Sequence, residues 1–231
     1  MKMEVFDDDE STAVAAAKII AGDARAAIAA RGYFIMAVSG GHTPWIMLRA
    51  LAKENLSWEH VHVAQVDERV APAGDADRNL THLRETLLQH SPILAEHIYA
   101  MPVESPDLES GARQYSASLS KIAGSPPTLD LVHLGLGPDG HTASLIPGDP
   151  VLNVTDADVA LTGIYQGRRR MTLTYPVING ARRILWLVTG GEKVNALAGL
   201  LRADVSIPAG RISQDRAVIC ADRAAAGNRA A

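Results

Sequence analysis

The sequence predicts an α/β fold, in which a mostly parallel β-sheet carries helices on both faces. Short apolar runs, typical of buried strands, alternate with longer helical segments along almost the whole chain. Several of these runs end in glycine-containing turns, as parallel strands that lead into a helix often do. The chain has 231 residues, of which 47% are hydrophobic, so it can fill the core of one α/β domain.

The amino-terminal part predicts two helices and a strand between them. A helix is expected over residues 11–31, because Ser11 can cap its start and a glycine follows its end. Residues 33–38 are typical of a buried strand, which ends at the glycine-containing segment 39–42. A Thr-Pro pair then begins a helix over residues 43–51, since proline is favoured in the first turn.

The same order of strand, polar turn and helix recurs through the rest of the chain. Further strands are expected at residues 61–66, 98–101, 131–136, 159–164, 171–174 and 184–189, and further helices at 79–90, at 107–122 and after 190–193. Because the alternation does not change in character, we expect a single Rossmann-like domain over residues 1–231. Its low-complexity tail is expected to fray from about residue 224.

Charge and composition exclude several classes of protein. A net charge of −4 and an isoelectric point near 6.0 favour neither nucleic-acid nor membrane binding, whereas a small anionic substrate is compatible with local basic groups. The first ten residues lack the layout of a signal peptide, and no apolar run reaches the length of a membrane span, so a cytoplasmic protein is expected. The single cysteine, Cys220, lies in an apolar run typical of a buried thiol.

The most informative segment is the strand at 131–136 and the turn that follows it. Glycines and Pro138 end the strand abruptly, so Asp139 and His141 should project from its carboxyl end, where ligands bind in open α/β sheets. The segment also has the Gly-x-Gly-x-x-Gly spacing of a dinucleotide-binding turn, but Pro147 leaves no room for the long helix that such a turn requires. A turn with merely solvated polar residues is the remaining alternative.

Four predicted strands end in polar groups, at residues 39–43, 67–69, 139–141 and 190–193. In a parallel sheet these ends meet at one edge. The first group has the features of a single-phosphate site: Gly40 and Gly41 allow close backbone approach, Ser39 and Thr43 add hydroxyls, and a helix begins there. Arg170 and Lys193 can supply the remaining positive charge.

His141 is the natural general base, because only histidine has an unperturbed pKa near neutral pH. The other histidines lie in or beside predicted elements, and His133 is expected inside its strand. A metal site built from His141, Asp139 and Asp67 is conceivable, but no typical ligand spacing supports one, so neither a metal nor a cofactor is expected.

Six motifs in order along the chain resemble the 6-phosphogluconolactonase family and the similar glucosamine-6-phosphate deaminases. They are Ser-Gly-Gly-x-Thr-Pro at 39–44, Asp-Glu-Arg at 67–69, Asp-x-Asp-Arg-Asn at 75–79, Gly-Leu-Gly-Pro-Asp-Gly-His-Thr-Ala-Ser-Leu at 135–145, Arg-Met-Thr-Leu-Thr at 170–174 and Gly-Gly-Glu-Lys at 190–193. The resemblance implies hydrolysis of 6-phospho-D-glucono-1,5-lactone in the oxidative pentose phosphate pathway, without metal or cofactor.

One position separates the two branches of this family. The deaminases carry a glutamate five residues after the motif histidine, and here that position is Ile146, which cannot transfer a proton. The lactonase branch is therefore expected. A hexosamine-6-phosphate deaminase and a non-catalytic sugar-phosphate sensor are the alternatives, although a sensor would need an effector domain.

The resemblance also suggests roles for individual residues. His141 would activate water, Asp139 or Asp67 would orient the imidazole or the sugar hydroxyls, and Arg69 would stabilise the oxyanion. The substrate would bind as a small sugar phosphate to a monomer or small homo-oligomer. Its phosphate would be held, and its pocket lined, by Ser39, Gly40, Gly41, Thr43, Arg78, Asn79, Arg170 and Lys193.

Overall fold

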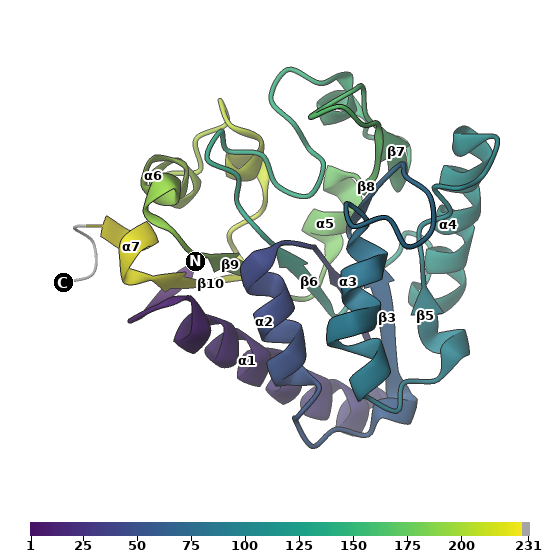
Figure 1. Ribbon diagram of the computed structural model, residues 1–231, viewed down its shortest axis with the longest axis horizontal. Helices are drawn as coiled ribbons and strands as arrows, with labels where there is room; N and C mark the ends of the chain where they lie inside the picture. The colour runs from purple at the N-terminus through teal and green to yellow at the C-terminus, as the bar shows by residue number, and fades with distance from the viewer. Residues whose placement is uncertain (228–231) are drawn as a thin grey trace.

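The computed structural model describes residues 1–227, and its main feature is a seven-stranded, entirely parallel sheet (Figure 1). The strand order is β1-β10-β9-β6-β2-β3-β5. This confirms the predicted α/β class. The strands are β1 (Lys2–Phe6), β2 (Phe34–Val38), β3 (Val61–Gln65), β5 (Ile98–Tyr99), β6 (Leu131–Leu134), β9 (Ile184–Val188) and β10 (Ala217–Asp222).

Helices cover both faces of this sheet, as predicted. Because successive strand residues point to opposite faces, Phe34 and Met36 pack on one side, whereas Ile35 and Ala37 pack on the other. The first side is covered by α1 (Asp9–Arg31), α2 (His42–Leu51) and α3 (Asn79–Thr86), which lie together in Figure 1. The second side is covered by α4 (Leu108–Ala123), α5 (Tyr175–Gly180) and α6 (Val194–Leu201). Short 3-10 turns complete the connections, at Trp58–His60, Leu88–His90, Ala95–His97, Pro150–Asn153, Gly191–Lys193 and Pro208–Arg211.

A second, three-stranded antiparallel sheet was not expected from the sequence. It consists of β4 (Asp67–Arg69), β8 (Arg170–Leu173) and β7 (Val159–Leu161), in that order. Residues 67–69 were expected as the polar end of the strand at 61–66, but they form a separate strand that pairs with β8, so that Arg69 lies opposite Arg170. The small sheet thereby brings residues that are about one hundred positions apart in sequence to the same place.

Several element boundaries differ from the predictions. The first helix begins at Asp9, not at a cap by Ser11. The Asp8 carboxylate accepts the Ser11 amide at 2.8 Å, and the Ser11 hydroxyl oxygen accepts the Asp8 amide at 3.2 Å. This is a capping box, which satisfies two amides at once. The strand expected at 159–164 ends at Leu161, where a tight hairpin begins. The sequence analysis did not predict β1 and β10.

The tail prediction is wrong for the residues that the structure describes. Residues 223–226 form a short helix, α7 (Arg223–Ala226), capped by the Asp222 carboxylate, and Ala225 and Ala226 are fully buried. Small apolar side chains can pack closely even in a low-complexity segment. Residues 228–231 lie outside the described part of the chain.

The strand order places a topological switch point between β2 and β6. From β2 the chain continues to β3 and β5 on one side, and from β6 it continues to β9 and β10 on the other. Ligands of open α/β sheets bind in the crevice at the carboxyl ends of such a pair. Among residues 1–227, no helix combines the length and the apolar character needed to cross a membrane.

Candidate active site

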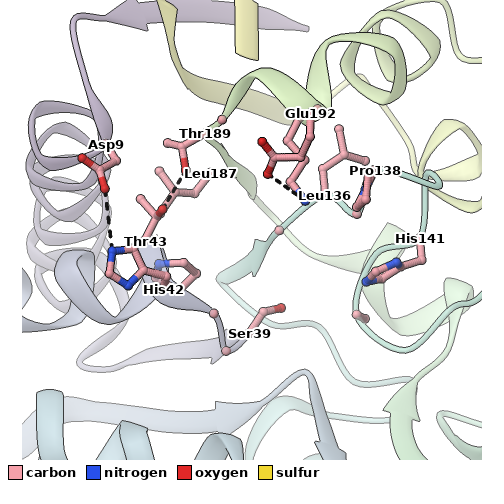
Figure 2. Close-up of a pocket in the computed structure, with 18 of the residues that line it drawn as sticks. Asp9, Ser39, His42, Thr43, Leu136, Pro138, His141, Leu187, Thr189 and Glu192 are labelled. Atoms are coloured by element: carbon pink, nitrogen blue, oxygen red, sulfur yellow. Dashed lines mark hydrogen bonds and ion pairs between the residues drawn. The ribbon is translucent and has the colours of Figure 1, made fainter. Parts of the chain in front are cut away.

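A cavity of about 820 Å³ opens at the carboxyl edge of the sheet, at this switch point (Figure 2). The turns after β2, β6 and β9 contribute to its walls together with residues of β4, so the four polar groups expected from the sequence meet there. In Figure 2, His141 lies across the cavity from Thr43, and Ser39 lies between them. Ten of the predicted site residues line the cavity: Ser39, Gly40, Gly41, Thr43, Asp67, Arg69, Asn79, His141, Arg170 and Lys193.

His141 forms a close pair with Asp139. The Oδ1 atom of Asp139 lies 2.6 Å from Nδ1 of His141 and also accepts the His141 backbone amide at 3.2 Å. Partial desolvation raises the pKa of Asp139, but the hydrogen bonds and charge of His141, with a bond from Tyr165, outweigh it and lower the pKa below its usual value. An ionised Asp139 favours the tautomer with the proton on Nδ1, which leaves Nε2 as an acceptor.

The turn that carries this pair requires glycine at position 137. A Cβ atom there would lie 2.1 Å from Nδ1 of His141 and 2.6 Å from Oδ1 of Asp139. Gly140 adopts a φ of 82°, and its amide bonds to the Gly137 carbonyl at 3.0 Å. Residues 141–149 form no helix, so the glycine spacing belongs to a tight turn and not to a dinucleotide site.

Asp67 is a buried carboxylate with partners other than His141. Its Oδ2 atom accepts the Ser144 hydroxyl at 2.6 Å, and its Oδ1 atom lies 3.3 Å from Nδ2 of Asn79. Burial raises its pKa, although the Ser144 bond, Arg69 and Arg170 oppose the shift. Arg69 in turn donates to Oδ1 of Asn79 at 2.7 Å. Of the two carboxylates considered for orienting the imidazole, the structure therefore places only Asp139 against it.

Arg78 does not line the cavity, in contrast to the prediction. Its side chain is buried, its Nε atom lies 3.2 Å from Oε2 of Glu68, and it donates to the Ala71 carbonyl at 2.9 Å. Glu68 is fully buried and also accepts the amides of Asn79 and Leu80. This pair attaches the start of α3 to β4 and so fixes Asn79. The sequence analysis missed Glu68, because a carboxylate next to Asp67 and Arg69 resembles another solvated site residue.

The turn after β2 is held in place by hydrogen bonds to β6. Ser39 donates its hydroxyl to the His133 carbonyl at 3.0 Å and its amide to Nδ1 of His133 at 3.3 Å. His133 is fully buried inside its strand, as predicted, and burial lowers its pKa to about 3. The Thr43 hydroxyl lies 2.6 Å from that of Thr189, which joins the starts of α2 and of the turn after β9.

Two cationic side chains, from β8 and from the turn after β9, line the cavity. Arg170 is almost completely buried on β8 and donates to Oε1 of Gln166 at 3.1 Å. Lys193 lies at the turn after β9, 3.6 Å from a carboxylate oxygen of Glu192. Both remain compatible with binding an anion in the cavity.

Tyr165 and Gln166 are site residues that the sequence analysis missed. The Tyr165 hydroxyl donates to Oδ2 of Asp139 at 3.2 Å, and the Arg170 guanidinium lies 4.9 Å from the centre of its ring. Gln166 lines the cavity. The available signal was a Gln-Gly pair between two predicted strands, which is compatible with a hairpin turn.

Within the described part of the chain, His, Cys, Asp and Glu side chains do not form a group of three or more that could hold a metal ion.

Cys220 is fully buried, and this burial raises its pKa to about 12. The thiol is therefore structural, as predicted.

Comparison with known proteins identifies the family. Residues 7–220 match the family described as glucosamine-6-phosphate isomerases/6-phosphogluconolactonase. The chain belongs to this family. A 6-phosphogluconolactonase of Mycobacterium tuberculosis is 36% identical over 238 residues, covering 97% of this chain and 96% of its relative. One of Synechocystis sp. is 41% identical over 175 residues, covering 74% of this chain and 72% of its relative.

Solved structures of family members show the same fold. A 6-phosphogluconolactonase from Trypanosoma cruzi superposes with a TM-score of 0.87 at 26% identity, over 98% of this chain and 96% of that one. A monomeric glucosamine-6-phosphate deaminase superposes with a TM-score of 0.84 at 21% identity, over 98% of this chain and 99% of that one. Because both branches of the family share the fold, the choice between them depends on the residues of the site.

Proposed function

We propose that this protein hydrolyses 6-phospho-D-glucono-1,5-lactone to 6-phospho-D-gluconate, the second step of the oxidative pentose phosphate pathway. The observation that carries the proposal is His141, which lines the cavity and pairs with Asp139, together with an apolar Ile146 five residues after it. The relatives named 6-phosphogluconolactonase, which are 36–41% identical, support the same activity.

The reaction needs one base and a stabilised oxyanion. Nε2 of His141 accepts a proton from water as the water oxygen attacks the lactone carbonyl carbon, and Asp139 stabilises the imidazolium that forms. We assign Arg69 to the developing oxyanion, because it lines the same cavity. The bond to the ring oxygen then breaks, and the imidazolium returns its proton to that oxygen. The products are a hydroxyl group and a carboxylic acid, which ionises in water.

The phosphate of the substrate is assigned to the start of α2, together with Arg170 and Lys193. A helix N-terminus with glycines favours a phosphate, since backbone amides and the helix dipole point toward it. The Ser39 hydroxyl already donates to the His133 carbonyl, so toward a phosphate we assign it only a supporting role in shaping the turn. Binding energy at this remote phosphate can hold the carbonyl against His141 in a reactive position.

Ile146 argues against deamination in this site. The side chain is apolar and 5% exposed, so it cannot supply the further proton transfers that ring opening and isomerisation of an amino sugar require.

We also propose that the protein acts in the cytoplasm, as a monomer or small homo-oligomer without nucleic-acid or membrane partners. The net charge of −4 supports the absence of anionic macromolecular partners.

The test compares freshly generated 6-phosphogluconolactone with glucosamine 6-phosphate, and corrects for the spontaneous hydrolysis of the lactone. Only the lactone should be converted faster than its spontaneous rate. Release of ammonia from the amino sugar would instead assign the chain to the deaminases, whereas binding of both compounds with conversion of neither would favour a sensor.

A further inference from the structure

The hairpin between β7 and β8 has a hydrogen-bonded tip that contacts the catalytic pair. Tyr165 and Arg168 exchange two backbone hydrogen bonds, of 2.9 and 3.2 Å, and the two residues between them have φ values of 51° and 80°. These are the features of a two-residue type I′ turn, which matches the twist of a β-hairpin. Arg168 also donates to Asp77 at 2.8 Å and to Asp75 at 3.1 Å, which attaches the tip to the loop before α3.

Tyr165 contacts three groups of the site from this tip. Its hydroxyl donates to Oδ2 of Asp139 at 3.2 Å, while Oδ1 of the same carboxylate faces Nδ1 of His141 at 2.6 Å. Its ring and the imidazole pack edge to face at a centroid distance of 5.6 Å, and the Arg170 guanidinium lies over its ring at 4.9 Å from the centroid. Desolvation and the nearby Asp139 raise the pKa of the Tyr165 hydroxyl, so it remains a donor at neutral pH.

We propose that Tyr165 is a positioning residue for the hydrolysis proposed above, on which this inference rests. Its hydroxyl fixes the rotation of the Asp139 carboxylate, so that one oxygen faces Nδ1 of His141 and Nε2 faces the cavity. Its ring holds the Arg170 guanidinium against the cavity wall. Asp67 and Arg69 of β4 also line the cavity, but they have their own partners and make no hydrogen bond to Asp139 or His141 in the described part of the chain.

The two contacts have separable consequences. Loss of the hydroxyl alone leaves the ring against Arg170, so substrate binding is retained while the imidazole is less well oriented. The Asp139 carboxylate has then lost one of its hydrogen bonds and can rotate, so its bond to Nδ1 of His141 is held less firmly. Loss of the ring also releases Arg170, and substrate binding is then weakened as well.

The experiment compares Tyr165→Phe and Tyr165→Leu with Tyr33→Phe, a control at a half-exposed tyrosine that precedes β2. Tyr165→Phe should lower kcat about tenfold with little change in KM, the scale expected for one lost hydrogen bond to a charged group. Tyr165→Leu should in addition raise KM. Tyr33→Phe should change neither parameter.

A second readout does not depend on turnover. In NMR, the Nδ1–H proton of His141, which faces Asp139 at 2.6 Å, should exchange faster with water in Tyr165→Phe than in the wild-type protein, whereas Tyr33→Phe should leave this exchange unchanged. Wild-type kcat and an unchanged exchange of the His141 Nδ1–H proton in Tyr165→Phe would overturn the proposal. If the wild-type protein did not hydrolyse the lactone at all, the proposed function would fail, and the exchange measurement would still decide whether Tyr165 positions the pair.

Discussion

Replacing Gly137 with alanine would displace the catalytic pair without removing any of its groups. The added Cβ would lie 2.1 Å from Nδ1 of His141 and 2.6 Å from Oδ1 of Asp139, whereas unstrained heavy atoms stay about 3.5 Å apart. The imidazole must therefore move by more than about 1 Å, and a misplacement of that size can cost about 10²-fold in rate. We expect kcat to fall by about that factor. Both displaced side chains are partly exposed, so the chain should still fold.

The assay is the initial rate on fresh 6-phosphogluconolactone at saturating concentration, corrected for spontaneous hydrolysis. The matched control is Gly22→Ala in α1, where the glycine is exposed and a Cβ would meet no atom within 4 Å. This control should retain full activity and gain about 0.5–1 kcal/mol in the free energy of unfolding, because alanine is the better helix residue. A Gly137→Ala enzyme with wild-type kcat would refute the geometric argument.

Three further outcomes follow from the site. Arg170→Ala and Lys193→Ala should each weaken the binding of 6-phosphogluconate by about 1.5–3 kcal/mol in calorimetry, and unchanged affinity in both would place the phosphate elsewhere. His133→Ala should lower the free energy of unfolding by about 2–4 kcal/mol in urea while kcat changes little, and the reverse pattern would give His133 a catalytic role. Burial lowers the pKa of His133 from 6.5 to about 3, so only the unfolded chain takes up its proton between these values. Wild-type stability should thus fall as the pH decreases from 6.5 toward 3, and His133→Ala should show a shallower loss.

The convergence of polar strand ends could be predicted from the sequence, because it depends on local patterns. Each of the turns at residues 39–43, 139–141 and 190–193 follows an apolar run directly, and a parallel sheet brings such turns to one edge. The Asp139–His141 pair is equally local, since both partners lie in one glycine turn. Patterns of this kind require no knowledge of distant partners.

The sequence analysis was wrong about Arg78 and missed Tyr165, because the partners of these residues cannot be recognised from the neighbouring sequence. Arg78 follows a loop with Pro, Gly and two Asp residues and resembles a solvated or substrate-binding arginine, but it is buried against Glu68. Tyr165 lies 26 positions from Asp139, and only the strand pairing of the small sheet brings the two together. Pairings across sheets depend on tertiary packing, which residue patterns along the chain do not encode.

The kinetics of His141→Ala on fresh 6-phosphogluconolactone test the central claim most directly. With the fold verified by circular dichroism, the rate above spontaneous hydrolysis should fall by about 10²–10⁴, the usual contribution of a positioned general base. The loss should appear in kcat, because the groups assigned to the phosphate remain in place. A folded His141→Ala enzyme that hydrolyses the lactone at the wild-type rate would contradict the role of His141 as the base.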